Sequence, residues 1–186
     1  MTGARTTTAL KEWSAAVRAL LDGRQTILLR KGGIGEKRFE VAANEFLLFP
    51  TVAHSHAQRV RPEHRDMLTE AAADSTEDQV TLRAAAKVVA AVAVNRPERL
   101  PDIEDLHIWT AESVRADRLD FRPKHQLAVL VVSAIPLVEP VRLTRTPDYA
   151  GCTSWVQLPT APRLAAPVHT DADLAGIAAR VRAAVA

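Results

Sequence analysis

Residues 25–34 read QTILLRKGGI, and this stretch decides which fold we expect. A short aliphatic run ends at Arg30 and Lys31, and Gly32 and Gly33 follow at once. An apolar run bounded by glycines is typical of a β-strand that leaves the core through a turn. Glycines let backbone N–H groups approach an anion, and the two cations would neutralise its charge. The stretch therefore predicts a strand followed either by a phosphate contact or by an ordinary charged turn.

A helix is expected before this strand, over Thr8–Leu21. Leu10, Trp13 and Val17 recur at spacings of three and four residues, which places them on one face of a helix. Thr8 is a suitable N-cap, and the Asp22–Gly23 pair is a typical helix end. We therefore expect the apolar face of this helix to pack on the sheet.

After the glycine pair, the pattern indicates further strands separated by short helices. Pro62 suits the first position of a helix because its missing N–H needs no partner there. Strands are expected at residues 38–41, 45–49 and 126–135, with 141–143 extending the last, and helices at 62–73 and within 105–119.

The sequence of segment 80–94 is compatible with either a helix or a strand. Its alanines favour a helix. However, Val80, Leu82 and Val88 alternate with polar residues, as in a strand with one face buried. We prefer the strand and keep the helix as the alternative.

The end of the chain predicts a linker and a helix. Residues 159–169 are rich in proline and alanine, which is typical of a linker. Thr170 can cap the following helix, with Asp173 at the reciprocal capping position. We therefore expect a main domain at 1–158, a linker at 159–169 and a C-terminal helix at 170–186. That helix either docks on the domain or serves as a surface for a protein partner.

Length and composition exclude several classes of protein. A chain of 186 residues can bury a hydrophobic core in one domain without disulfide bonds or structural metals. Its single cysteine, Cys152, cannot form an internal disulfide, and no apolar stretch is long enough to cross a membrane. The start of the chain lacks a signal-type apolar segment. These features favour a cytoplasmic protein without a membrane partner.

Positive charge is clustered, although the formal net charge is only +2. Clustering rather than total charge indicates a nucleic-acid surface. Arg122 and Lys124 are candidates for phosphate contact, and their alternative role is a solvated basic loop. The clusters comprise Arg30 and Lys31, then Arg59, Arg61 and Arg65, and finally Arg115, Arg118, Arg122 and Lys124.

Two tryptophans are candidates for base stacking. Aromatic residues make up only 4% of the chain, so Trp109 in LHIWT and Trp155 in TSWVQL stand out. Stacking of a base on such a ring contributes about 1–3 kcal/mol. Tryptophan is also a common core residue, and this reading is preferred for Trp13.

The sequence gives weaker signals for catalysis. His54 and His56 could share a strand face as two metal ligands, but no familiar spacing completes the set, so we expect no metal and no cofactor. Cys152 and Ser154 could act as nucleophiles with His125 as base, yet no third orienting group is recognisable.

Six blocks of sequence occur in an order that resembles a bacterial family classed as a domain of unknown function. They lie between residues 9 and 158 and read ALKEW, LLDGRQTILLRKGGI, FLLFPT, LHIWT, RPKHQLAVLVV and GCTSWVQL. The tail from Pro159 is expected to lie outside this family. The GRQTILLR segment after a helix is also similar to the opening of PUA-like and ASCH-type barrels, which bind RNA, modified bases or nucleotides. This resemblance implies an α+β fold with a small mixed β-barrel, an N-terminal helix and a C-terminal helical appendage.

We therefore expect a non-catalytic module that binds RNA, DNA or a nucleotide. Arg30, Lys31, Gly32 and Gly33, with Arg122 and Lys124, would hold phosphate, and Trp109 and Trp155 would stack on bases. One alternative is a metal-dependent nuclease or nucleotide-processing enzyme that uses His54, His56 and a carboxylate such as Glu45. Another is a protein-interaction adaptor that uses the C-terminal helix.

Overall fold

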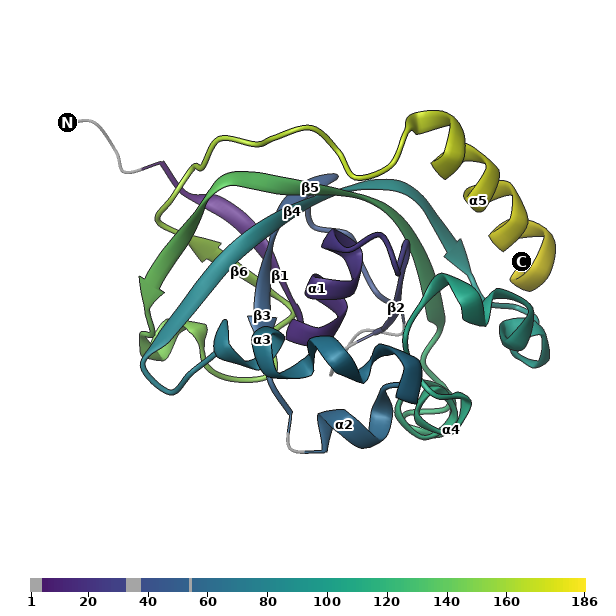
Figure 1. Ribbon diagram of the computed structural model, residues 1–186. Helices are drawn as coiled ribbons and strands as arrows, with labels where there is room; N and C mark the ends of the chain where they lie inside the picture. The colour runs from purple at the N-terminus through teal and green to yellow at the C-terminus, as the bar shows by residue number, and fades with distance from the viewer. Residues whose placement is uncertain (1–4, 33–37, 54) are drawn as a thin grey trace.

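The computed structural model describes residues 5–32, 38–53 and 55–186, and its framework is one mixed sheet of six strands (Figure 1). Their order in the sheet is β2-β5-β4-β3-β1-β6. All neighbouring pairs are antiparallel except β1 and β3, which are parallel. The strands are β1 (Thr7–Trp13), β2 (Ile27–Lys31), β3 (Glu45–Thr51), β4 (Gln79–Ala93), β5 (Leu127–Thr144) and β6 (Trp155–Leu158).

The sheet is curved but not closed. In the described parts of the chain, no strand pairing joins the edge strand β2 to β1 or β6. The α+β class is therefore confirmed, whereas the expected small mixed β-barrel is not. Side chains cross the gap instead, because Arg30 Nη1 donates a hydrogen bond to the carbonyl of Lys11 at 3.1 Å.

The long strands β4 and β5 produce the curvature. Figure 1 shows them arching together over α1 (Ser14–Leu21). Their register shifts between Leu82 and Ala84 and again between Val88 and Ala90. Such irregularities bend a strand and increase its twist. The preferred strand assignment for 80–94 is thereby confirmed, because alternation of buried and exposed positions outweighed the helix propensity of alanine.

The hydrophobic core lies on both faces of this sheet. One cluster packs Val17 and Leu20 of α1 against Ala84 and Ala86 of β4. Small residues on β4 let the helix approach the sheet closely. A larger cluster joins β2, β4 and β5 to α5 (Asp171–Val185) and to the helical turns of η2 (Pro97–Leu106).

The remaining helical segments are short and lie at the ends of strands. Figure 1 shows α2 and α3 below the arch and α4 beside them. They are α2 (His56–Arg59), η1 (Pro62–Met67), α3 (Leu68–Ala73), α4 (Ala111–Val114), the π-helical turn η3 (Arg115–Asp120) and η4 (Pro147–Tyr149). The helices expected at 62–73 and within 105–119 are therefore present, each divided into two types of helix.

Two expectations for the first half of the chain were wrong. The helix expected over Thr8–Leu21 begins only at Ser14, and Thr7–Trp13 forms β1. The reason is tertiary, because β1 lies inside the sheet between β3 and β6, where Ala9 and Leu10 are both buried. The strand expected at 38–41 is reduced to a single bridge between Arg38 and Gln126.

The C-terminal helix forms as expected and docks on the domain. Thr170 Oγ1 accepts a hydrogen bond from the backbone N–H of Asp173 at 3.2 Å, which is the predicted cap. Residues 159–169 contain no helix, and one bridge ties Leu164 to Leu137 of β5. Within the described ranges, no helix combines the length and apolar character needed to cross a membrane.

Candidate functional site

A basic pocket of ≈ 820 Å³ lies where three strands end together. Register places Lys31 of β2 opposite Leu127 of β5, and Ala93 of β4 opposite Ala128. The C-terminal ends of β2 and β4 therefore meet the beginning of β5. The loop before β5 and the π-helical turn η3 complete the wall, and all these segments contribute lining residues. We call this hollow the basic pocket.

Cations outnumber anions in the basic pocket. Glu40 is its one acidic lining residue among those that the structure describes. Arg38 and Lys124 are exposed and form no side-chain hydrogen bond or ion pair with another described residue. The basic lining residues are Lys31, Arg38, Arg118, Lys124 and His125.

Arg118 is the most unusual cation of the basic pocket. Burial lowers the pKa of its guanidinium, the carboxylates of Glu12 and Asp117 act to raise it, and Arg30 and Arg59 lower it further. An arginine nevertheless stays charged at neutral pH. Its only hydrogen bond to the described residues is a long one, at 3.5 Å, to the carbonyl of Asp117. The guanidinium forms no ion pair with a described residue, and it lies over the ring of Trp13 at 5.9 Å.

Lys31 is committed to the protein itself. Its Nζ donates to the carbonyls of Arg118 at 2.6 Å and Phe121 at 2.5 Å, and a longer bond reaches Leu119. Burial and the nearby Arg118 lower the pKa of Lys31. The strand-end cation predicted from the sequence therefore lines the pocket, but its ammonium holds the end of η3.

Arg30 points away from the basic pocket. Its Nη1 lies 3.2 Å from Oε2 of Glu12, and its guanidinium stacks on the ring of Phe39 at 5.0 Å. Gly32 is buried, and its carbonyl lies 3.1 Å from His125 Nδ1. Gly33 and His54 lie outside the described residues. The predicted group at residues 30–33 is therefore divided, and only Lys31 lines the pocket.

Lys124 and Arg122 have different surroundings despite their proximity in sequence. Lys124 lines the basic pocket. Arg122 adopts a positive φ of 51° and stacks on Phe121 at 4.9 Å, outside the pocket lining. The turn that it forms is closed by a hydrogen bond from the N–H of His125 to its carbonyl.

Neither predicted stacking residue faces the basic pocket. Trp109 is 6% exposed and lies edge-on to Trp13, with ring centroids 5.0 Å apart. Trp155 stacks on Phe39 at 5.9 Å and donates from its indole N–H to the carbonyl of Glu40. Trp13 also packs in the core, as preferred from the sequence, beneath the guanidinium of Arg59.

The cluster Arg59, Arg61 and Arg65 supports the structure around η2. Arg61 donates to the carbonyls of Glu104, His107 and Trp109. Arg65 donates to the carbonyl of Val60, and Arg59 pairs with Asp117. Such local partners explain why this cluster contributes no lining residue to the basic pocket.

The residues considered for catalysis are not assembled into one group. His56 is buried, its ring lies 4.9 Å from that of Trp13, and burial lowers its pKa. Cys152 is exposed, and Glu45 lies on β3 opposite Lys87 of β4. Within the described ranges, no group of three or more His, Cys, Asp or Glu could hold a metal ion.

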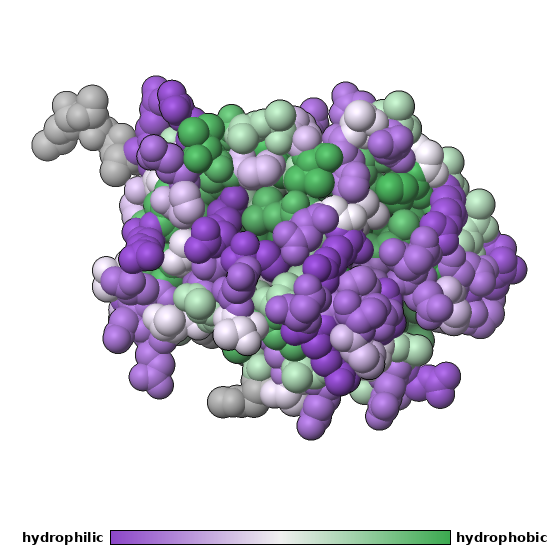
Figure 2. All heavy atoms as spheres, in the orientation of Figure 1, coloured by the Kyte–Doolittle hydropathy of each residue, from purple (hydrophilic) through white to green (hydrophobic). Residues whose placement is uncertain are grey.

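Sequence reasoning missed part of the basic pocket. Arg118 belonged to a recognised basic cluster, so charge clustering was a usable signal for it. Arg38 carried no such signal, because it reaches the pocket only through its bridge to Gln126, far along the chain. Figure 2 shows a largely hydrophilic surface on one face of the molecule, with hydrophobic residues visible in separate patches.

Comparison with known proteins identifies the family. No curated protein matches the chain. A family model described as a domain of unknown function (DUF1802) matches residues 9–180. The match continues through the linker and most of α5, so the expectation that the tail from Pro159 lies outside the family was wrong. Because the match covers nearly the whole sequence, the chain belongs to this family of proteins with a domain of unknown function.

Proposed function

We propose that this protein binds a nucleotide or nucleic acid through its basic pocket, and that it acts by binding rather than by catalysis. The observation that carries the proposal is the pair of exposed cations Arg38 and Lys124, which line the pocket and form no ion pair with another described residue. Arg118 lines the same pocket and adds to its positive charge. Phosphate oxygens are the acceptors that guanidinium groups bind best.

The set of residues in this proposal differs from the set expected at first. Lys124 is retained from the expected set, and Arg38, Arg118 and His125 are added. Arg30, Arg122 and the two tryptophans are left out, because their side chains are engaged elsewhere. The resemblance of GRQTILLR to PUA-like and ASCH barrels favours the same class of ligand, although the sheet is not closed into a barrel. A cytoplasmic location in bacteria, expected from the sequence, remains part of the proposal.

The test is a titration of labelled RNA and DNA oligonucleotides and of mononucleotides across a salt series. Phosphate contacts release counterions, so affinity should fall steeply between about 50 and 200 mM salt. Lys124→Ala should weaken binding and reduce the salt slope for oligonucleotides by about one. Arg142→Ala is the matched control, because Arg142 is exposed near the other end of β5. Absent or salt-insensitive binding, or equal losses in the two variants, would contradict the proposal.

A further inference from the structure

A second pocket, of ≈ 430 Å³, lies between η2 and the segment that contains α4 and η3. Its walls are mostly apolar, and we call it the apolar pocket. The walls are formed by Pro97, Leu100, Pro101, Ala111, Val114 and Leu119.

The apolar pocket adjoins the basic pocket. Pro97 and Leu119 line both, so the two hollows share a boundary. A ligand that occupies both needs only a short connection between a charged group and an apolar group. A nucleotide has this form, because one sugar ring separates its phosphate from its base.

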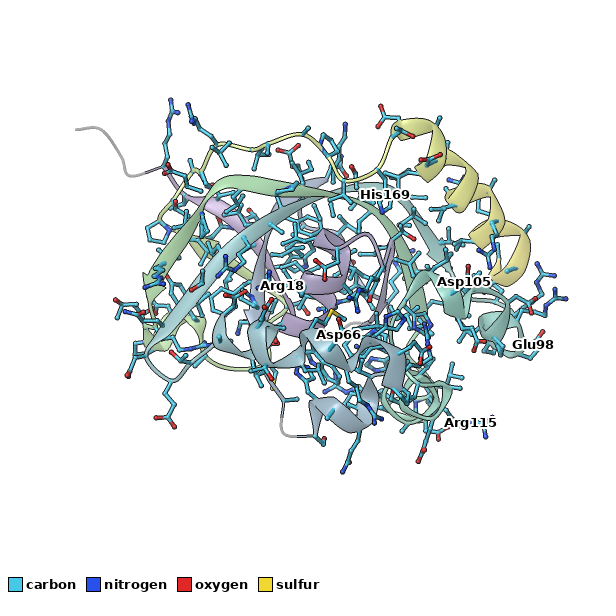
Figure 3. All side chains as sticks on the ribbon, in the orientation of Figure 1. Arg18, Asp66, Glu98, Asp105, Arg115 and His169 are labelled. Carbon is cyan, nitrogen blue, oxygen red and sulfur yellow. The ribbon has the colours of Figure 1, made fainter. Side chains whose placement is uncertain are left out.

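Polar groups around the apolar pocket distinguish a base from a hydrocarbon chain. Glu98 and Glu104 offer acceptors, and Arg115 offers donors. Figure 3 shows Glu98 on η2 and Arg115 at the beginning of η3, on different segments of this part of the molecule. The edges of a nucleobase present donors and acceptors together, whereas an alkyl chain presents neither.

His107 adds a neutral donor to the same wall. Its Nδ1 accepts a hydrogen bond from the N–H of Trp109 at 3.0 Å, which places the ring proton on Nε2. Burial lowers the pKa of His107 to about 4, so the ring is uncharged at neutral pH. Arg61 holds this wall in place through the carbonyls of Glu104 and His107.

We propose that the two pockets form one site for a mononucleotide, with the phosphate in the basic pocket and the base in the apolar pocket. This inference rests on the proposed function and narrows it to nucleotides. The polar groups of the apolar pocket favour a heteroaromatic ring over an alkyl chain.

The experiment compares four mononucleotides with inorganic phosphate, with the matching nucleosides and with decyl phosphate, by calorimetry and by amide chemical shifts. At least one mononucleotide should bind about tenfold more tightly than inorganic phosphate. Ala111→Phe should fill the apolar pocket and reduce nucleotide affinity about tenfold, while leaving phosphate affinity unchanged. Ala172→Phe is the matched control, because Ala172 is an exposed residue in the first turn of α5.

Each outcome separates this inference from the function on which it rests. The shared site is overturned if nucleotides bind no more tightly than phosphate, or if Ala111→Phe leaves nucleotide affinity unchanged. The basic pocket alone then remains as the binding site. If decyl phosphate binds more tightly than every nucleotide, the assignment of the apolar pocket to a base is wrong, and a lipid phosphate is indicated. Absence of binding by every phosphate-bearing probe, oligonucleotides included, overturns the proposed function itself.

Discussion

Arg30 on β2 and Glu12 on β1 form an ion pair across the gap that keeps the sheet from closing, with Nη1 and Oε2 3.2 Å apart. Glu12 is 3% exposed, and it lies within electrostatic reach of Arg118 as well. One buried carboxylate therefore balances more than one guanidinium. The pair holds together two strands that no backbone hydrogen bond joins among the residues described.

Glu12→Gln should destabilise the fold by roughly 3–5 kcal/mol, because it leaves the charge of Arg30 without a partner in a poorly solvated place. Urea unfolding at neutral pH measures the change. Glu139→Gln serves as the control, because Glu139 is exposed on β5, and it should leave the free energy of unfolding unchanged. Equal stability of the two variants would show that the pair contributes nothing.

Lys31→Met should lower the free energy of unfolding by roughly 1–3 kcal/mol, because the carbonyls of Arg118 and Phe121 lose their shared donor. Lys124→Met removes an exposed cation of the same pocket and should leave stability unchanged. Thermal unfolding of both variants at equal protein concentration gives the comparison. A stability loss in Lys124→Met that matches the loss in Lys31→Met would refute this division of roles.

Stability should fall as the pH drops from neutral toward 5, because of His107. Burial lowers its pKa from 6.5 to about 4, so between these values the unfolded chain binds a proton that the folded chain does not. The contribution of the neutral His107 ring to the free energy of unfolding is fully present above about pH 6.5 and decreases as the pH falls toward about 4. At about pH 5 the loss is roughly 2 kcal/mol relative to pH 7.5.

His107→Asn tests the source of this pH dependence. An asparagine side chain keeps an oxygen acceptor for the N–H of Trp109 but has no proton to gain. The variant should lose less stability than the parent between the two pH values in urea unfolding. The pKa of His56 and the pKa of His64 are also lowered by burial, so a smaller pH effect should persist. An unchanged pH dependence would exclude His107 as its main source.

Deletion of residues 168–186 should abolish stable folding. Leu174, Val181 and Val185 of α5 are fully buried in the core cluster that includes β2, β4 and β5. Burial of one such side chain contributes about 1.5–3 kcal/mol, and a whole domain is stable by only about 5–15 kcal/mol. Circular dichroism and mass measurement of the truncated chain give the answer.

A stable, unchanged monomer after this deletion would contradict the docked position of α5. An Arg180→Ala variant provides a milder companion test. Arg180 donates to the carboxylate of Asp105, which Figure 3 shows beside α5. That variant should fold and lose less stability than the truncated chain, because its ion pair is exposed.

Local sequence patterns predicted the elements that carry their own signals. The apolar run before Lys31 forms β2, and the alternation in 79–93 forms β4 despite its alanines. Thr170 caps α5 as its side chain and position indicated. In each case the residues that decide the structure are neighbours in the chain.

Long-range arrangement could not be predicted in the same way. Leu10, Trp13 and Val17 fit a helical spacing, but the two neighbouring strands convert the first part of that segment into β1. The prediction of the site was incomplete for a similar reason. Arg30 pairs with the buried carboxylate of Glu12, 18 residues earlier in the chain. Arg38 lies at the basic pocket because of its single β-bridge to Gln126.

The position of β1 also constrains how a nascent chain acquires this fold. Thr7 pairs with Leu158, so one side of β1 stays without its neighbour until the residues of β6 have emerged from the ribosome. Pairings this distant in sequence slow folding, because the chain loses the entropy of a long loop before the stabilising contacts can form. Meanwhile the unpaired edge of β1 offers backbone groups to other chains. We therefore expect chain terminations shortly before Trp155 to aggregate during synthesis.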